Sequence, residues 1–154
     1  GGLYYCGDEL AISKGEYENA TIVVEGDVSI KKNTILRNMT FISKGEVESE
    51  GSVDIIDTFI LAKEEIELEF GGNDSSSGWF YSADEIELVL RGKAGLFNGN
   101  IISQGKVDIE TKGKQEFKFK SPDTNDFSDI FSADPGDDSN KVFEIDSWKI
   151  GLKE

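Results

Sequence analysis

The chain has 154 residues, of which 37% are hydrophobic, so its size suits a single domain with a thin core. Its 31 acidic and 16 basic residues give a formal net charge of −15, which argues against binding to nucleic acid or to an anionic membrane surface. Histidine is absent and Cys6 is the single cysteine, which excludes an imidazole base, an imidazole metal ligand and an intramolecular disulfide. No apolar run reaches the length of a transmembrane helix.

A pattern of two short strands joined by a tight corner recurs about every 19 or 20 residues. It is most regular at residues 22–30, which run Ile-Val-Val-Glu-Gly-Asp-Val-Ser-Ile. The apolar residue after each corner marks the repeats, and these markers are Leu10, Val28, Val47, Ile66, Ile86 and Val107. Large apolar residues precede the markers by six places: Ile22, Phe41, Ile60, Phe80 and Ile101. Mostly small residues precede the markers by four places: Val24, Ser43, Ala62, Ser82 and Ser103.

This repeat predicts an all-β fold, a single-stack parallel β-solenoid (β-helix) of about six rungs, where one rung is one repeat of about 19–20 residues. No helical periodicity interrupts it, and one unit alone could not bury its apolar side. Glycine at the corner (Gly26, Gly45 and Gly105) supplies the backbone angles of a tight bend. We expect one extra residue in the first corner, Gly7-Asp8-Glu9.

The same sequence predicts where the stack is interrupted. Residues 69–78 are rich in glycine and serine and are expected to form a loop, with the next strand starting at Trp79. Residues 91–100 are expected to form a looser turn. We predict solenoid repeats over residues 1–120, an acidic loop over 121–140, and a C-terminal strand over 141–154 that caps the stack or packs on its side.

Acidic residues flank the markers on the predicted outer surface. They would stack in columns at the strand spacing of about 5 Å, and they are Asp27, Glu46, Glu48, Glu65, Glu67, Glu85, Glu87 and Asp108. The face they form could bind cations or a cationic partner, or it could be a solvated face that discourages sheet aggregation. Either way, we expect crowding to raise the pKa values of these carboxyl groups.

A second column lies five places before the markers and is apolar: Val23, Ile42, Leu61, Tyr81 and Ile102. Its neighbours on both sides are predicted to point inward, so this column would point outward. It would then be a docking stripe for a partner, unless the C-terminal segment covers it or it lines the core at a bend.

Other candidate sites are weaker. Residues 123–129 carry three aspartates but lack the central glycine and the closing glutamate of an EF-hand calcium loop. Trp79 and Trp148 could stack on sugars, although such residues are more often part of a core or cap. The two arginines, Arg37 and Arg91, do not stand beside an acidic cluster at a repeated position, so we predict no catalytic residues, metal or cofactor.

Three segments near the N-terminus are similar in sequence to a known protein family. Residues 2–5 (Gly-Leu-Tyr-Tyr), 6–13 (Cys-Gly-Asp-Glu-Leu-Ala-Ile-Ser) and 21–30 (Thr-Ile-Val-Val-Glu-Gly-Asp-Val-Ser-Ile) are similar to the soluble part of bacterial PilX-like minor pilins. The match covers roughly residues 2–50, and the repeats more distantly resemble the polymer-forming bactofilins. The resemblance implies an extracellular, pilus-associated location, with the pilin membrane helix removed before Gly1; a bactofilin-like chain would be cytoplasmic.

Together these observations predict a non-enzymatic structural or adhesive module that presents its side faces and two loops, 71–79 and 121–140, to a protein or a surface polysaccharide. This part of the chain is expected to contact neither nucleic acid nor a membrane. One alternative is a self-assembling scaffold that stacks end to end. Another is a carbohydrate-active β-helix enzyme, which would need paired carboxylates in a cleft.

Overall fold

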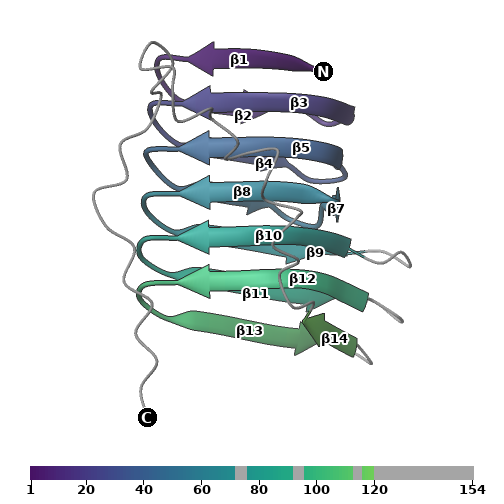
Figure 1. The fold of residues 1–154 in the computed structure, drawn as a ribbon. Coiled ribbons are helices and arrows are strands. Elements are labelled where there is room, and N and C mark those ends of the chain that lie inside the picture. Colours follow the sequence, from purple (N-terminus) through teal and green to yellow (C-terminus); the bar gives the residue numbers. More distant parts are fainter. Residues whose placement is uncertain (72–75, 92–95, 113–115, 120–154) are drawn as a thin grey trace, which may run out of the picture. The chain divides into compact units, whose positions relative to one another are not determined.

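In the computed structural model, residues 1–71, 76–91, 96–112 and 116–119 are described, and they form a parallel β-solenoid, as the repeat predicted (Figure 1). Sheet A has the strand order β1 (Gly2–Cys6), β3 (Glu16–Val24), β5 (Ile35–Ser43), β8 (Thr58–Ala62), β10 (Ser76–Ser82), β12 (Leu96–Ser103), β14 (Glu116–Phe119), with β7 (Asp54–Ile56) also paired to β5. Sheet B has the order β13 (Val107–Lys112), β11 (Ile86–Arg91), β9 (Ile66–Phe70), β6 (Val47–Glu50), β4 (Val28–Lys31), β2 (Leu10–Ile12). Consecutive rungs therefore place successive strands of each sheet side by side.

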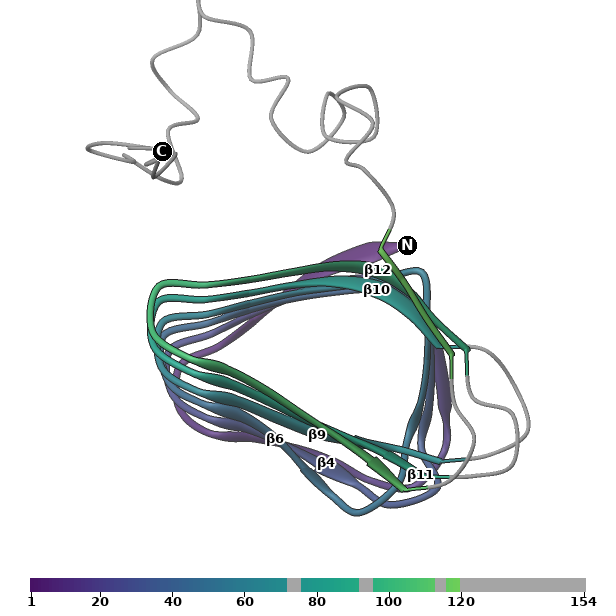
Figure 2. The ribbon, with the colours of Figure 1, turned by 90° about the horizontal axis from the view of Figure 1, so that it is seen from below.

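Seen along its axis, the stack has three sides (Figure 2). Sheet A supplies two of them. In three rungs it bends at a residue with a positive φ: Asn19 (58°) within β3, Asn38 (48°) within β5, and Asp57 (48°) between β7 and β8. Asparagine and aspartate tolerate this left-handed conformation better than most residues. The side chains also bond across rungs, with Asn38 Nδ2 donating to Asn19 Oδ1 at 2.9 Å. The bend is therefore encoded by a polar residue at one fixed position of the repeat.

The six marker residues are in register. Leu10, Val28, Val47, Ile66, Ile86 and Val107 pair in succession through sheet B. The prediction of an extra residue in the first corner was wrong, because Cys6 pairs with Val24 and Leu10 with Val28, four residues later in both rungs. Asp8 simply takes the place that Gly26 has in the next rung.

Two buried serines, Ser43 and Ser82, stabilise the corners of later rungs. Ser43 Oγ donates to the carbonyl oxygen of Gly26 in the preceding rung at 2.6 Å and accepts from the backbone amide of Gly45 at 3.1 Å. Ser82 makes the same pair of bonds with Glu64 and Asp84, and its side chain is fully buried. The sequence pattern indicated only that these residues are small. Their hydroxyls also make hydrogen bonds to backbone groups of two rungs.

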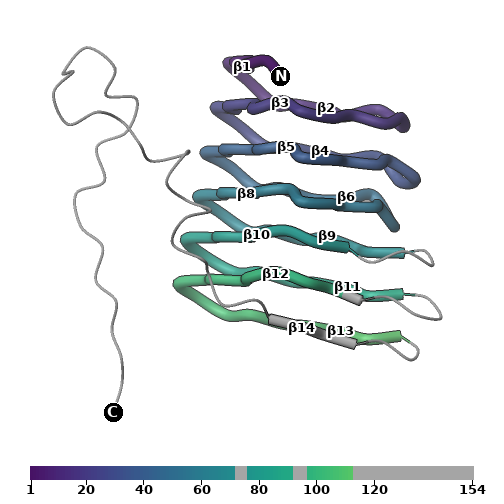
Figure 3. The backbone as a smooth tube through the Cα atoms, turned by 45° about the vertical axis from the view of Figure 1, so that its right-hand side comes forward, coloured from purple at the N-terminus to yellow at the C-terminus, as the bar shows by residue number. Residues whose placement is uncertain are grey.

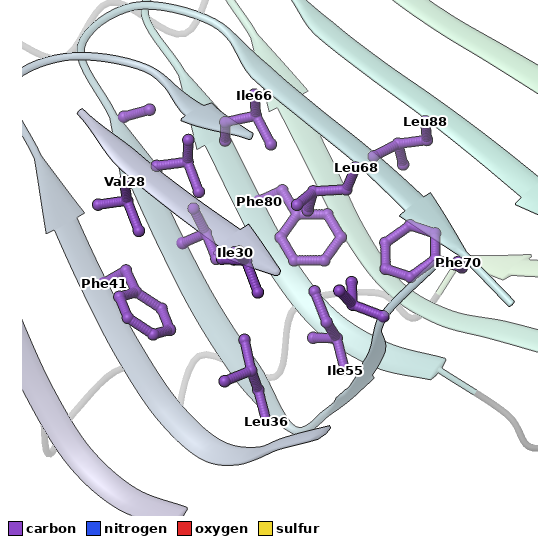
Figure 4. Packing of buried hydrophobic residues seen from close by; sticks show 14 of the residues in the cluster. Val28, Ile30, Leu36, Phe41, Ile55, Ile66, Leu68, Phe70, Phe80 and Leu88 are labelled. Carbon is purple, nitrogen blue, oxygen red and sulfur yellow. The ribbon is translucent and has the colours of Figure 1, made fainter. Parts of the chain in front are cut away.

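The core fills the space between the sheets (Figure 4). The marker residues Val28, Val47, Ile66 and Ile86 are fully buried, as are Phe41 and Ile60 from the column six places before. Further along, three phenylalanines meet: the ring of Phe70 stacks on Phe80 with centroids 6.0 Å apart, and Phe97 lies 5.5 Å from Phe80. Burial of these side chains is the main favourable contribution to folding.

Two predicted loops are shorter than expected. β9 continues to Phe70 and β10 begins at Ser76, so residues 76–78 belong to a strand and Trp79 does not start it. Likewise β12 begins at Leu96. Here glycine marks close stacking and not a loop, because a Cβ on Gly99 would lie 1.8 Å from the carbonyl oxygen of Gly78. The predicted acidic loop 121–140 and terminal strand 141–154 lie outside the described residues, as do residues 72–75.

Candidate functional site

The predicted acidic columns exist on the outer face of sheet B. In one column Glu48 pairs with Glu67, Glu67 with Glu87 and Glu87 with Asp108. The other column follows the backbone bonds in which each marker amide donates to the next rung: Leu10 to Asp27, Val28 to Glu46, Val47 to Glu65, Ile66 to Glu85 and Ile86 to Lys106. The two columns together bring all eight predicted carboxylates onto one face, which we call the acidic face.

Several of these carboxylates already have partners within the chain. Asp27 Oδ1 accepts a hydrogen bond from the backbone amide of Glu46 at 2.9 Å. That carboxylate lies beside Gly45, where an added Cβ would be 2.0 Å from Oδ1, so a larger residue at position 45 would displace the Asp27 side chain from this bond. At the other end Lys106 Nζ lies 2.8 Å from Asp108 and 3.4 Å from Glu85. The acidic face is therefore partly neutralised at its C-terminal end.

The pKa values follow this arrangement and correct the simple expectation of crowding. Partial burial, and then the neighbouring carboxylates, raise the pKa of Glu46 and that of Glu65 above the ordinary value. Asp108 behaves in the opposite way, because its hydrogen bond from Lys106 lowers its pKa. Crowding is thus the secondary cause of the raised pKa values of Glu46 and Glu65. The prediction of a raised pKa was wrong for Asp108.

The carboxylates of the acidic face are spread over the surface and do not surround a single point. Among the described residues, no three Cys, Asp or Glu side chains come together in a group that could hold a metal ion. Carboxylates spread along two columns can attract cations without binding one at a fixed position.

The predicted apolar column is also continuous. Val23, Ile42, Leu61, Tyr81 and Ile102 follow one another in register on sheet A, and Tyr5 extends the column at the N-terminal end. Burial alternates along β8 and β10, with Ile60, Ala62, Phe80 and Ser82 inside and Leu61 and Tyr81 half-buried outside. The exposed fraction reaches 68% for Tyr5 and 54% for Ile102.

A second outward column, not predicted from the sequence, lies two residues away on the same sheet. It contains Leu3, Thr21, Thr40, Phe59, Trp79 and Asn100. Leu3 is 75% exposed, while Phe59 and Trp79 are half-buried. The strict alternation of a strand could have identified this column once the apolar column was placed outside. The two columns together form what we call the apolar face.

No protein-family model, no curated protein and no solved structure matches this chain. The described residues contain no helix of the length and apolar character needed to cross a membrane.

Proposed function

We propose that this chain is a non-enzymatic structural module of a bacterial cell surface, associated with pili, which docks a partner protein through the apolar face. The observation that supports this is the apolar column itself, which runs without interruption from Tyr5 to Ile102 across six rungs. Ordered apolar patches of this kind on a protein surface are typical of protein interaction sites.

The rigidity of the stack suits this role. From β3 to β12, each outward side chain stands on a strand that is hydrogen-bonded on both sides within the stack, so this part of the apolar face keeps its shape when it meets a partner. Little conformational entropy is then lost on docking. The aliphatic side chains Val23, Ile42 and Leu61 favour a protein over a polysaccharide, since sugars are bound by polar groups and by stacking on aromatic rings, and these side chains supply neither.

The test is a double substitution on the apolar face, Ile42→Thr with Leu61→Thr, introduced into the gene of the producing bacterium. Threonine already stands on this face at Thr21 and Thr40, so the strands keep their β propensity. Attachment of cells to one another and to surfaces should fall to the level of a deletion strain. If a panel of neutral and acidic polysaccharides binds the wild-type chain and not the variant, the partner is a polysaccharide and the protein assignment is wrong.

A second candidate function is an end-to-end scaffold, and the terminal rungs favour it. Tyr4 pairs with Ile22 at a core position, yet it is 59% exposed on β1 at the edge of sheet A. At the other end the marker Val107 is 43% exposed on β13, at the edge of sheet B. Among the described strands, β1 and β13 are each the outermost strand of a sheet, and parallel edges of this kind can accept another chain. Filaments in electron micrographs of the purified chain would support this function, and a monomer at all concentrations in sedimentation velocity would refute it.

A further inference from the structure

The ends of β2, β4 and β6 lie in successive rungs of the stack (Figure 3). A basic hollow lies at this corner, next to the end of the acidic face. Its lining comes from three successive rungs: Ser13 and Lys14 after β2, Lys31, Lys32 and Asn33 at the end of β4, and Glu50 at the end of β6. The volume is about 560 Å³ and the hollow opens to solvent. This size is within the range of sites that bind small ligands or a few units of a polymer.

The charge of the hollow is opposite to that of the chain. Three ammonium groups and one carboxylate line it, in a protein whose formal net charge is −15. Lys31 is paired with Glu50, which also accepts a hydrogen bond from Ser29 Oγ at 3.2 Å. Among the described residues, neither Lys14 nor Lys32 has an acidic group within ion-pair distance. Within the described part of the chain, the lysines that line the hollow thus include two, Lys14 and Lys32, without an ion-paired carboxylate.

The backbone that carries these lysines is fixed from several sides. Thr34 is fully buried, and its Oγ1 donates to the carbonyl oxygen of Lys31 at 2.5 Å and, at 3.4 Å, to that of Ser13. Tyr17 Oη also donates to the Ser13 carbonyl, at 3.0 Å. The amide of Asn33 donates to Ser52 of the next rung at 2.8 Å. The backbone at the base of the hollow is thus held in place, and a ligand has to order only the exposed side chains at its rim.

From this geometry we propose that the hollow binds an acidic polysaccharide, with its carboxylate or phosphate groups held by Lys14 and Lys32. Lysine acts as a point charge for such groups, while the Ser13 hydroxyl and the Asn33 amide are placed to bond neutral sugar hydroxyls. An open hollow suits a polymer that passes along the corner. This site is separate from the apolar face, so its presence does not depend on the docking function proposed above.

The experiment uses the full chain with three polymers: oligomers of galacturonic acid, oligomers of mannose joined by phosphodiester groups, and neutral dextran. Binding is followed by amide NMR titration and by calorimetry. We expect one or both acidic polymers to shift amides of residues 13–15 and 31–34, with no shift from dextran. The two acidic arms show whether carboxylate or phosphate is preferred.

The decisive variant is Lys14→Gln with Lys32→Gln, which should weaken binding at least about tenfold. The matched control is Lys44→Gln with Lys63→Gln, which removes the same charge at exposed positions outside the hollow and should leave binding unchanged. Circular dichroism melts check that both variants fold. The proposal is overturned if no acidic polymer binds, if both variants bind equally well, or if single-stranded DNA binds as tightly as the glycans. None of these results would affect attachment through the apolar face, which the threonine variant tests independently.

Discussion

Replacing Ser82 by alanine removes one hydroxyl and almost no volume, and it isolates the bonds that hold a corner of the solenoid. The Ser82 side chain is fully buried, donates to the carbonyl oxygen of Glu64 and accepts from the amide of Asp84 at 2.9 Å. Each such bond contributes about 1 kcal/mol net, and the loss of both costs about 2 kcal/mol. For a chain of this size, that corresponds to a fall in melting temperature of about 4–8 °C.

The assay is thermal unfolding followed by circular dichroism, with urea unfolding as a second measure of the free energy. The matched control is Ser29→Ala, because Ser29 Oγ bonds only to an exposed carboxylate and its loss should cost less than about 0.5 kcal/mol. The reasoning about the corner is refuted if Ser82→Ala melts within a degree of the wild type, or if the two variants lose the same stability.

Two further predictions concern the acidic face and the tightest part of the stack. Because the folded-state pKa values of Glu46 and Glu65 are raised, the folded chain binds more protons than the unfolded chain above the ordinary value of 4.5, and stability falls as pH rises through this window. The double variant Glu46→Gln with Glu65→Gln should therefore be more stable at pH 7, by about 0.2–1 kcal/mol for each like-charge pair removed. At a pH below the ordinary pKa it should show no gain in stability. An equal gain at pH 7 and at the lower pH would contradict this. Gly99→Ala should unfold or strongly destabilise the chain, since its Cβ would overlap the backbone of Gly78. The control is Gly7→Ala, whose Cβ meets only a side chain at 3.7 Å and which should melt near the wild type. Similar melting temperatures for the two variants would contradict this, because they would show that the strands of Gly78 and Gly99 can separate.

Much of the fold could be predicted because the repeat keeps a constant length from Asn19 to Val28 and at the equivalent positions of later rungs. Over that part, apolar positions specify which side chains point inward and therefore the strand register. The same constancy placed the acidic and apolar columns correctly. The variation in repeat length, by contrast, falls entirely between the end of each sheet B strand and the start of the next rung.

The sequence could not align side chains across that variable corner. Lys14, Lys32 and Glu50 meet there only because three turns of different sequence stack on one another. Glycine was misleading for a related reason, since Gly78 and Gly99 are required by close backbone contact, which composition does not distinguish from a loop. The bond from the amide of Glu46 to Asp27 was equally out of reach, because it depends on the side-chain rotamer.

The measurement that tests the proposed docking function most directly is cell attachment with three chromosomal alleles: wild type, Ile42→Thr with Leu61→Thr, and the control Glu67→Gln on the opposite, acidic face. Each protein is first shown to be present at equal amounts and to melt at a similar temperature. If the apolar face docks a partner, the threonine variant attaches no better than a deletion strain while the glutamine variant attaches like the wild type. Normal attachment by the threonine variant would contradict the proposal.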